Sequence, residues 1–96
     1  MRYCHRTSIP IDDVLAEADR YLGVRLEQVQ AEAKSRTFSG TMGTITVTVE
    51  AEGGHYTLIT VTTDQVGESE ADRLAKRFLA TVHKQVHPEH EVKGAY

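Results

Sequence analysis

Alternating apolar and polar residues mark two strands in the middle of the chain. Residues 44–49 read Thr-Ile-Thr-Val-Thr-Val, and residues 56–63 continue the alternation with Leu, Ile and Val among threonines. A period of two is typical of strands that bury one face and leave the other polar. Two consecutive glycines separate these segments, which predicts that the strands form an antiparallel hairpin.

Two registers are open for this hairpin. A two-residue turn at the glycines pairs Glu52 with His55, whereas a three-residue loop over 52–54 pairs Ala51 with His55. Shifting the register by one residue moves every side chain of one strand to the opposite face, so the choice decides what the sheet buries. We prefer the three-residue loop because it gathers the apolar side chains on one face: Ile45, Val47, Val49, Ile59 and Val61.

Helical spacing appears before this hairpin, over 12–22. The stripe follows Pro10 and two aspartates, which suit a first helical turn, and it ends before Gly23, where a left-handed residue commonly terminates a helix. Its apolar members are Val14, Leu15, Ala18 and Leu22. Residues 24–35 fit both a helical stripe and strand alternation. We favour a strand with a bulge there, because the glycine stop indicates a new element.

The second helix is predicted over 69–87. It begins at Ser69, a good N-cap residue, and is halted by Pro88. Its apolar stripe consists of Ala71, Leu74, Ala75, Phe78, Val82 and Val86. The tail over 88–96 is either loose or docks Val92 as a short terminal strand.

Together the segments predict one domain over 1–96 with a two-layer α+β fold. Residues 3–8 are a candidate first strand, and a four-residue loop over 40–43 puts Phe38 on the apolar face of the hairpin. The predicted order is strand, helix, three or four antiparallel strands, helix. Both helices then cover one face of the sheet, where each can bury its apolar stripe.

Three stretches carry a resemblance to known folds: RTSIPIDDVLAEADRYLG, FSGTMGTITVTVEAEGGHYTLITVTT and ADRLAKRFLATVHKQV. Their order resembles the strand–helix–meander–helix plan of the TATA-box-binding-protein-like fold. It also resembles a shortened version of the helix-grip fold of START-like lipid-binding proteins. The resemblance implies a sheet with helices on one side, and it carries over no functional residue because it rests on element order.

Composition narrows the range of partners and compartments. The net charge is −3 and the pI is near 5.9, which argues against nucleic acid, because phosphate binding needs clustered Lys and Arg. Cys4 is the single cysteine, so no internal disulfide is expected. We find no signal peptide and no apolar run long enough to span a membrane. The expected compartment is therefore the cytoplasm.

Histidines near the end of the second helix are the best candidates for metal chemistry. His83 and His87 are four residues apart, a spacing that puts both on one helix face, and His90 or Glu89 could complete a ligand shell. A metalloprotease is excluded because Lys84 stands where the catalytic glutamate belongs. We favour the simpler interpretation that these histidines interact with the helix dipole and face water, so no metal is expected.

The threonine-rich strip is the unusual feature of the predicted sheet. Its members alternate with the apolar residues of the hairpin, and the simpler interpretation is a solvated face of residues that favour strands. The sharper interpretation is ligand or partner contact at Thr46, Thr48, Tyr56, Leu58 and Thr60. The main hypothesis is a non-catalytic assembly module that binds itself as a homodimer, or another protein, through this face or an edge. No nucleophile, base or cofactor motif stands in a workable arrangement, so we expect neither catalysis nor a cofactor.

The alternative hypothesis is a small carrier that holds an apolar ligand between the second helix and the sheet. The predicted walls of its pocket are Phe38, Val47, Ile59, Leu74, Phe78 and Val82. A packed core uses the same residue types, so the pattern alone leaves both possibilities open.

Overall fold

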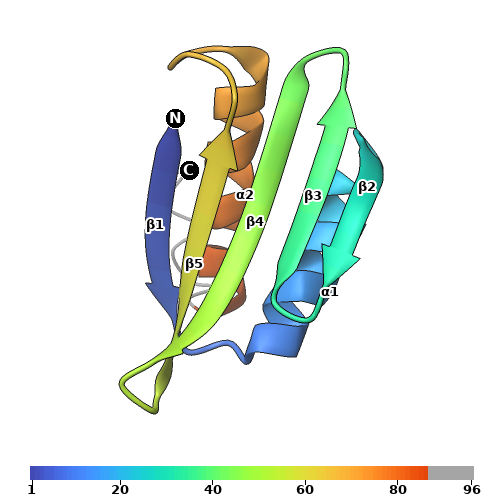
Figure 1. The fold of residues 1–96 in the computed structure, drawn as a ribbon. Coiled ribbons are helices and arrows are strands. Elements are labelled where there is room, and N and C mark those ends of the chain that lie inside the picture. Colours follow the sequence, from blue (N-terminus) through green and yellow to red (C-terminus); the bar gives the residue numbers. More distant parts are fainter. Residues whose placement is uncertain (87–96) are drawn as a thin grey trace.

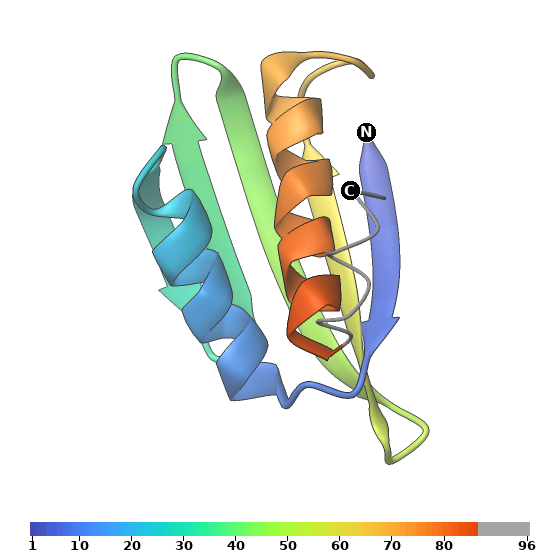
Figure 2. The same cartoon turned by 180° about the vertical axis from the view of Figure 1, so that it is seen from behind.

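The computed structural model describes residues 1–86 as an antiparallel five-stranded sheet with two helices on one face (Figure 1; Figure 2). The elements are β1 (Arg2–Thr7), α1 (Ile11–Leu22), β2 (Glu27–Glu32), β3 (Ser35–Gly40), β4 (Gly43–Glu52), β5 (Tyr56–Thr63) and α2 (Glu70–Val86). The predicted two-layer α+β class is confirmed, with four strands in the meander. Predictions for 87–96 lie outside the described residues.

The strand order in the sheet is β1-β5-β4-β3-β2. Strands β2 to β5 follow one another as a meander, and β1 adds to the free side of β5 with Arg2 opposite Thr62 and Thr7 opposite Thr57. The first strand of the chain therefore pairs with the last. Both helices lie behind the sheet in Figure 1, so its front face has no covering element among residues 1–86.

The ambiguous segment after α1 forms a strand, as favoured from the sequence. β2 pairs with β3, and its register shifts between Gln28 and Gln30, which is the expected bulge. The conformation of Gly23 differs from the prediction, because its φ of −67° is right-handed rather than left-handed. A glycine is needed here for space instead: a Cβ would lie 2.2 Å from the carbonyl oxygen of Asp19.

The β4–β5 hairpin has neither of the two predicted registers. Glu52 pairs with Tyr56, so the loop consists of Gly53, Gly54 and His55. Both glycines adopt left-handed backbone conformations, with φ of 65° and 79°, which centres the loop on them. The preferred register is wrong by two positions along one strand. Because the side-chain period is also two, the predicted faces are unchanged.

The β3–β4 register agrees with the prediction. Phe38 pairs with Ile45 and lies on the apolar face, where it is fully buried. The connecting loop is shorter than the predicted four residues, because Gly40 and Gly43 also pair and leave only Thr41 and Met42 between the strands.

The core lies between the two helices and the sheet. It combines the apolar stripes of α1 and α2 with alternate residues of β3, β4 and β5, and Phe78 is completely buried within it. Ser69 caps α2, with its Oγ accepting a 3.1 Å hydrogen bond from the Asp72 backbone N–H, as the sequence predicted. Within residues 1–86, neither helix is long and apolar enough to cross a membrane.

Candidate functional site: the open face of the sheet

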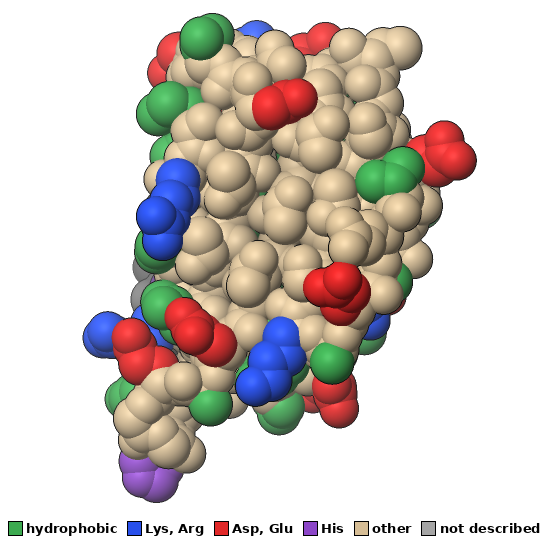
Figure 3. Space-filling model, in the orientation of Figure 1, with side chains coloured by type: hydrophobic (Ala, Val, Ile, Leu, Met, Phe, Trp, Pro, Cys, Tyr) green, Lys and Arg blue, Asp and Glu red, His purple; other side chains and the backbone are tan. Residues whose placement is uncertain are grey.

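The face of the sheet opposite the helices is covered with small hydroxyl side chains. Thr46 and Thr48 alternate with the buried Ile45, Val47 and Val49 along β4. Cross-strand pairing extends the same face over β3 and β5, because directly paired residues point to one side. Its hydroxyl-bearing residues are Ser35, Thr37, Ser39, Thr44, Thr46, Thr48, Thr60 and Thr62. Figure 3 shows this surface as a broad area of tan atoms. We call it the open face.

Neighbouring hydroxyls on the open face contact one another across the strands. Thr37 and Thr46 have their Oγ1 atoms 3.4 Å apart, and Ser39 Oγ lies 3.2 Å from Thr44 Oγ1. At the β1 side, Cys4 Sγ lies 3.8 Å from Thr60 Oγ1. These hydroxyls have partners within the sheet, so covering them costs less free energy than burying unpaired hydroxyls would.

Tyr56 and Leu58 lie near the hairpin end of the open face rather than among the threonines. Tyr56 remains 52% exposed, and the Arg6 guanidinium lies 6.0 Å from the centre of its ring. Arg6 also forms an ion pair with Glu52, the cross-strand neighbour of Tyr56. This end of the face therefore presents an aromatic ring beside a neutralised charge pair.

Most charged side chains of the open face lie at its margins, and the central strand β4 adds Glu50, opposite Leu58, and Glu52 at the hairpin end. The β1 margin carries Arg2 and Arg6, whose cross-strand partners on β5 belong to this face. The β2 margin carries Glu27 and Glu32, which pair with Ser39 and Ser35. The lysines of residues 1–86 lie elsewhere, at Lys34 in the β2–β3 turn and on α2 at Lys76 and Lys84. The result is a nearly uncharged centre between one basic and one acidic margin.

A separate cleft lies between β1 and α2 on the other side of the sheet. It has a volume of about 370 Å³ and is lined by His5, Lys76, Leu79, Ala80 and His83. The six predicted walls of an apolar carrier pocket do not line it. They are packed in the core, each at most 1% exposed: Phe38, Val47, Ile59, Leu74, Phe78 and Val82.

The structure places only part of the predicted histidine cluster. His83 lies on α2 with its ring near that of His5 on β1, while His87 and His90 lie outside the described residues. Within 1–86, no group of three or more His, Cys, Asp or Glu side chains could hold a metal ion. His5 was absent from the predicted cluster because its approach to α2 depends on where β1 joins the sheet.

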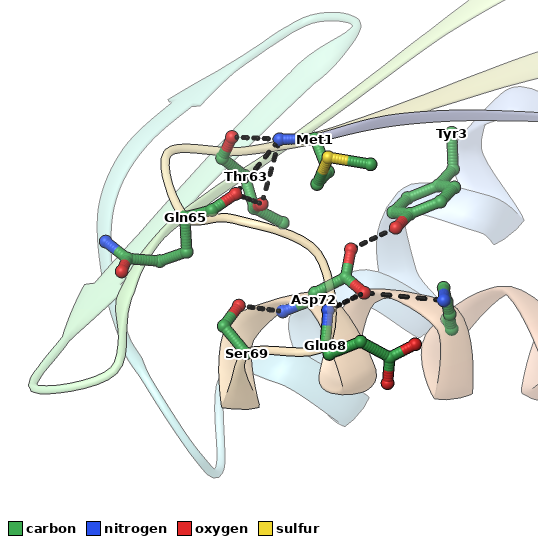
Figure 4. Close-up of polar contacts among 8 residues, drawn as sticks. Met1, Tyr3, Thr63, Gln65, Glu68, Ser69 and Asp72 are labelled. Carbon is green, nitrogen blue, oxygen red and sulfur yellow. Dashed lines mark hydrogen bonds and ion pairs between the residues drawn. The ribbon is translucent and has the colours of Figure 1, made fainter.

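A buried carboxylate joins β1 to the beginning of α2 (Figure 4). Asp72 is fully buried and accepts hydrogen bonds from the Tyr3 hydroxyl and, at 3.0 Å, from the Glu68 backbone N–H. The Lys76 amine lies 3.4 Å from its Oδ2. The hydrogen bond from Tyr3 lowers the pKa of Asp72 and raises that of Tyr3, with smaller contributions from Glu68 and Lys76 on the carboxylate. The carboxylate is held ionised among its own partners, which indicates a structural role.

Sequence reasoning found the β4 and β5 members of the open face and missed those on neighbouring strands. Ser35, Thr37 and Ser39 alternate with the buried Phe38 along β3. Because the sequence already predicted that Phe38 faces the core, the same alternation could have placed these three residues on the opposite face. Arg2 and Arg6 gave no such signal, because β1 shows no strong alternation of apolar residues.

Comparison with models of known families, with curated proteins and with solved structures finds no match to this chain.

Proposed function

We propose that this chain is a non-catalytic assembly module that binds a second copy of itself through the open face. The observation that carries the proposal is the nearly uncharged centre of that face, made of small hydroxyls across β3, β4 and β5. Interface centres are depleted in charged residues, and Lys and Glu in particular are rarer there than on the remaining surface. A sheet that only meets water has no need for such depletion.

The charged margins favour a second copy over an unrelated partner. When two identical sheets pack face to face around a two-fold axis parallel to the strands, β1 of each lies over β2 of the other. In the strand register Arg2 is level with Gln30, between Glu27 and Glu32, and Arg6 lies one step beyond Glu32, so the basic margin of each copy lies along the acidic margin of the other. A two-fold axis across the strands would oppose like margins instead, so the margins favour the first arrangement. That arrangement also brings the two copies of Glu50 on the central strand β4 towards each other.

The area of the open face sets the expected strength of this contact. Five strands about 4.8 Å apart and about 20 Å long present roughly 500 Å² per copy. Two copies bury about 1,000 Å², at the lower end of specific interfaces, so we expect a weak, reversible dimer. Pairing through the outer edge of β2 is disfavoured, because that edge is charged and carries the bulge.

The exposed thiol of Cys4 fits the expected cytoplasmic location. Its side chain lies on the open face beside Thr60 and has no disulfide partner. Thiols of this kind persist in reducing compartments. The proposed contact would cover Cys4, so dimerisation is also expected to slow its reaction with a thiol reagent.

Replacing Thr46 with lysine is expected to convert the dimer into a folded monomer. Thr46 lies at the centre of the face, opposite Thr37 on β3 and Thr62 on β5. A lysine there would bury an unpaired charge at the contact, while costing the isolated fold about 1 kcal/mol or less. Sedimentation equilibrium over protein concentrations from about 5 to 500 µM covers the range in which a weak, small interface forms a dimer.

The matched control is Ala16→Lys, which adds the same charge to the exposed side of α1 and should leave the dimer intact. If the parent protein is a monomer throughout this range, the proposal is wrong. An unfolded Thr46→Lys variant would show that the face is covered within one copy, which also contradicts it.

The direction of the two-fold axis is tested by exchanging charges. Arg2→Glu should weaken the dimer by placing a negative charge along the second copy's acidic margin, and adding Glu27→Arg should restore it. If the double variant forms a weaker dimer than either single variant, the two margins do not face each other, and a two-fold axis parallel to the strands is excluded.

A further inference from the structure

The imidazole rings of His5 and His83 meet in the cleft between β1 and α2. Their centroids are 5.9 Å apart and their planes are 77° apart. The two residues come from opposite ends of the described chain, and each is half-buried. Pairing of β1 with β5 places His5 on the helix side of the sheet, opposite Ile59 of the core. A histidine pair of this kind is built by the fold rather than by neighbouring positions on one helix.

The separation of the rings is close to what a shared metal ion requires. Two imidazoles that bind one tetrahedral ion at about 2.0–2.1 Å have ring centroids about 5.2 Å apart. The observed distance exceeds this by less than 1 Å. The ring torsion of histidine is broad, so the torsions themselves allow a nitrogen of each ring to turn towards a common point.

Two imidazoles that meet in one cleft suit a cation. A neutral imidazole offers a lone pair to a metal ion, and the two rings side by side offer two such ligands.

The rest of the cleft accommodates such an ion. Leu79 and Ala80 supply apolar walls, and the volume of about 370 Å³ leaves room for water ligands. Lys76 is the permanent cation of the lining, and its amine is held 3.4 Å from the buried Asp72 carboxylate, which offsets its charge. Imidazole ligands favour Zn²⁺, Ni²⁺ and Cu²⁺ over Mg²⁺ and Ca²⁺.

We propose that His5 and His83 bind one divalent transition-metal ion, with water in the remaining coordination positions, and so tie β1 to the C-terminal half of α2. The two ligands come together only in the folded chain. Metal binding therefore stabilises the folded state by mass action. This site lies on the helix side of the sheet and is independent of the proposed dimer contact.

The first experiment follows the parent protein, without a histidine tag, by NMR of its imidazole resonances. Substoichiometric Ni²⁺ should broaden the signals of His5 and His83 together, and Zn²⁺ should shift both with one-to-one stoichiometry. His55, exposed in the β4–β5 loop, is the internal control and should be unaffected at the same ratios. Perturbation of His83 without His5 would overturn the proposal, because it would place the ion on α2 and the residues that follow it.

The second experiment measures zinc affinity by calorimetry and zinc-dependent melting. His5→Asn and His83→Asn should each weaken Zn²⁺ binding by about tenfold or more, since each removes one of two protein ligands. His55→Asn should retain the parent's affinity and its rise in melting temperature. Unchanged Zn²⁺ affinity in His5→Asn would contradict the proposal. So would the absence of saturable binding in the parent up to about 1 mM Zn²⁺, a concentration at which even a site with a dissociation constant of about 1 mM is half occupied. Should an asparagine variant fail to fold, the NMR titration of the parent decides the question.

Discussion

Replacing Phe78 with alanine is expected to lower the free energy of unfolding by about 3–5 kcal/mol. The side chain is completely buried on α2, and its ring centre lies 6.3 Å from that of Tyr21 on α1. Removing it takes away a large apolar surface and leaves a cavity among side chains from both helices and the sheet. For a domain of this size, the loss corresponds to a fall of about 15–30 °C in melting temperature.

Chemical denaturation of Phe78→Ala and the parent protein measures this effect, and Arg77→Ala is the matched control. Arg77 is the exposed neighbour of Phe78 on the same helix, so its truncation should leave stability within about 0.5 kcal/mol of the parent. A similar result for the two alanine variants would contradict the packing of α2 onto the sheet. The comparison should be made at one protein concentration, because dimerisation would stabilise the folded state.

Removing the buried charge of Asp72 is the second substitution expected to have a large effect. Asp72→Asn deprives the Tyr3 hydroxyl, the Glu68 backbone N–H and the Lys76 amine of their common acceptor charge. The control is Glu70→Gln, which removes an exposed carboxylate from the same first turn. Like Asp72→Asn it loses a favourable interaction with the helix dipole, but it leaves the contacts of Asp72 intact. We expect Asp72→Asn to melt at a clearly lower temperature than Glu70→Gln at pH 7. Equal melting temperatures of the two variants would mean that the contacts of Asp72 with Tyr3, Glu68 and Lys76 add no stability beyond the interaction of a carboxylate with the helix dipole.

The pH dependence of this difference has a defined direction. Because the folded-state pKa of Asp72 lies below its ordinary value of 3.8, the stabilisation is present above that value and is lost as the pH falls through the folded-state pKa. The difference in melting temperature between the parent and Asp72→Asn should therefore shrink from pH 7 to pH 3. A difference that stays constant over this range would show that the carboxylate has the same pKa in the folded and unfolded chains.

The faces of the strands could be predicted from the sequence, whereas the position of the hairpin loop could not. Alternation along β4 and β5 identifies which residues are buried, and every register of the same parity preserves that assignment. The pattern does not distinguish registers that differ by two residues. The left-handed conformations of Gly53 and Gly54 decide between them, and each glycine is compatible with more than one loop.

The candidate sites show the same division between local pattern and long-range pairing. Thr46, Thr48 and Thr60 were predicted to share a face because they alternate with core residues of their own strands. Arg2 could not be assigned to the margin of that face until β1 was paired with β5. The same pairing brings His5 to His83. Local periodicity contains no information about which strand lies beside the first one.

The place of β1 in the sheet has a consequence for how the chain folds during its synthesis. β2 to β5 pair with their neighbours in sequence, so each hairpin can close as soon as its two strands have emerged from the ribosome. β1 is made first, yet its partner is Tyr56–Thr63. At about 5–20 residues per second, several seconds separate the synthesis of the two strands. During that interval β1 has no native partner, and a late, high-contact-order step completes the sheet.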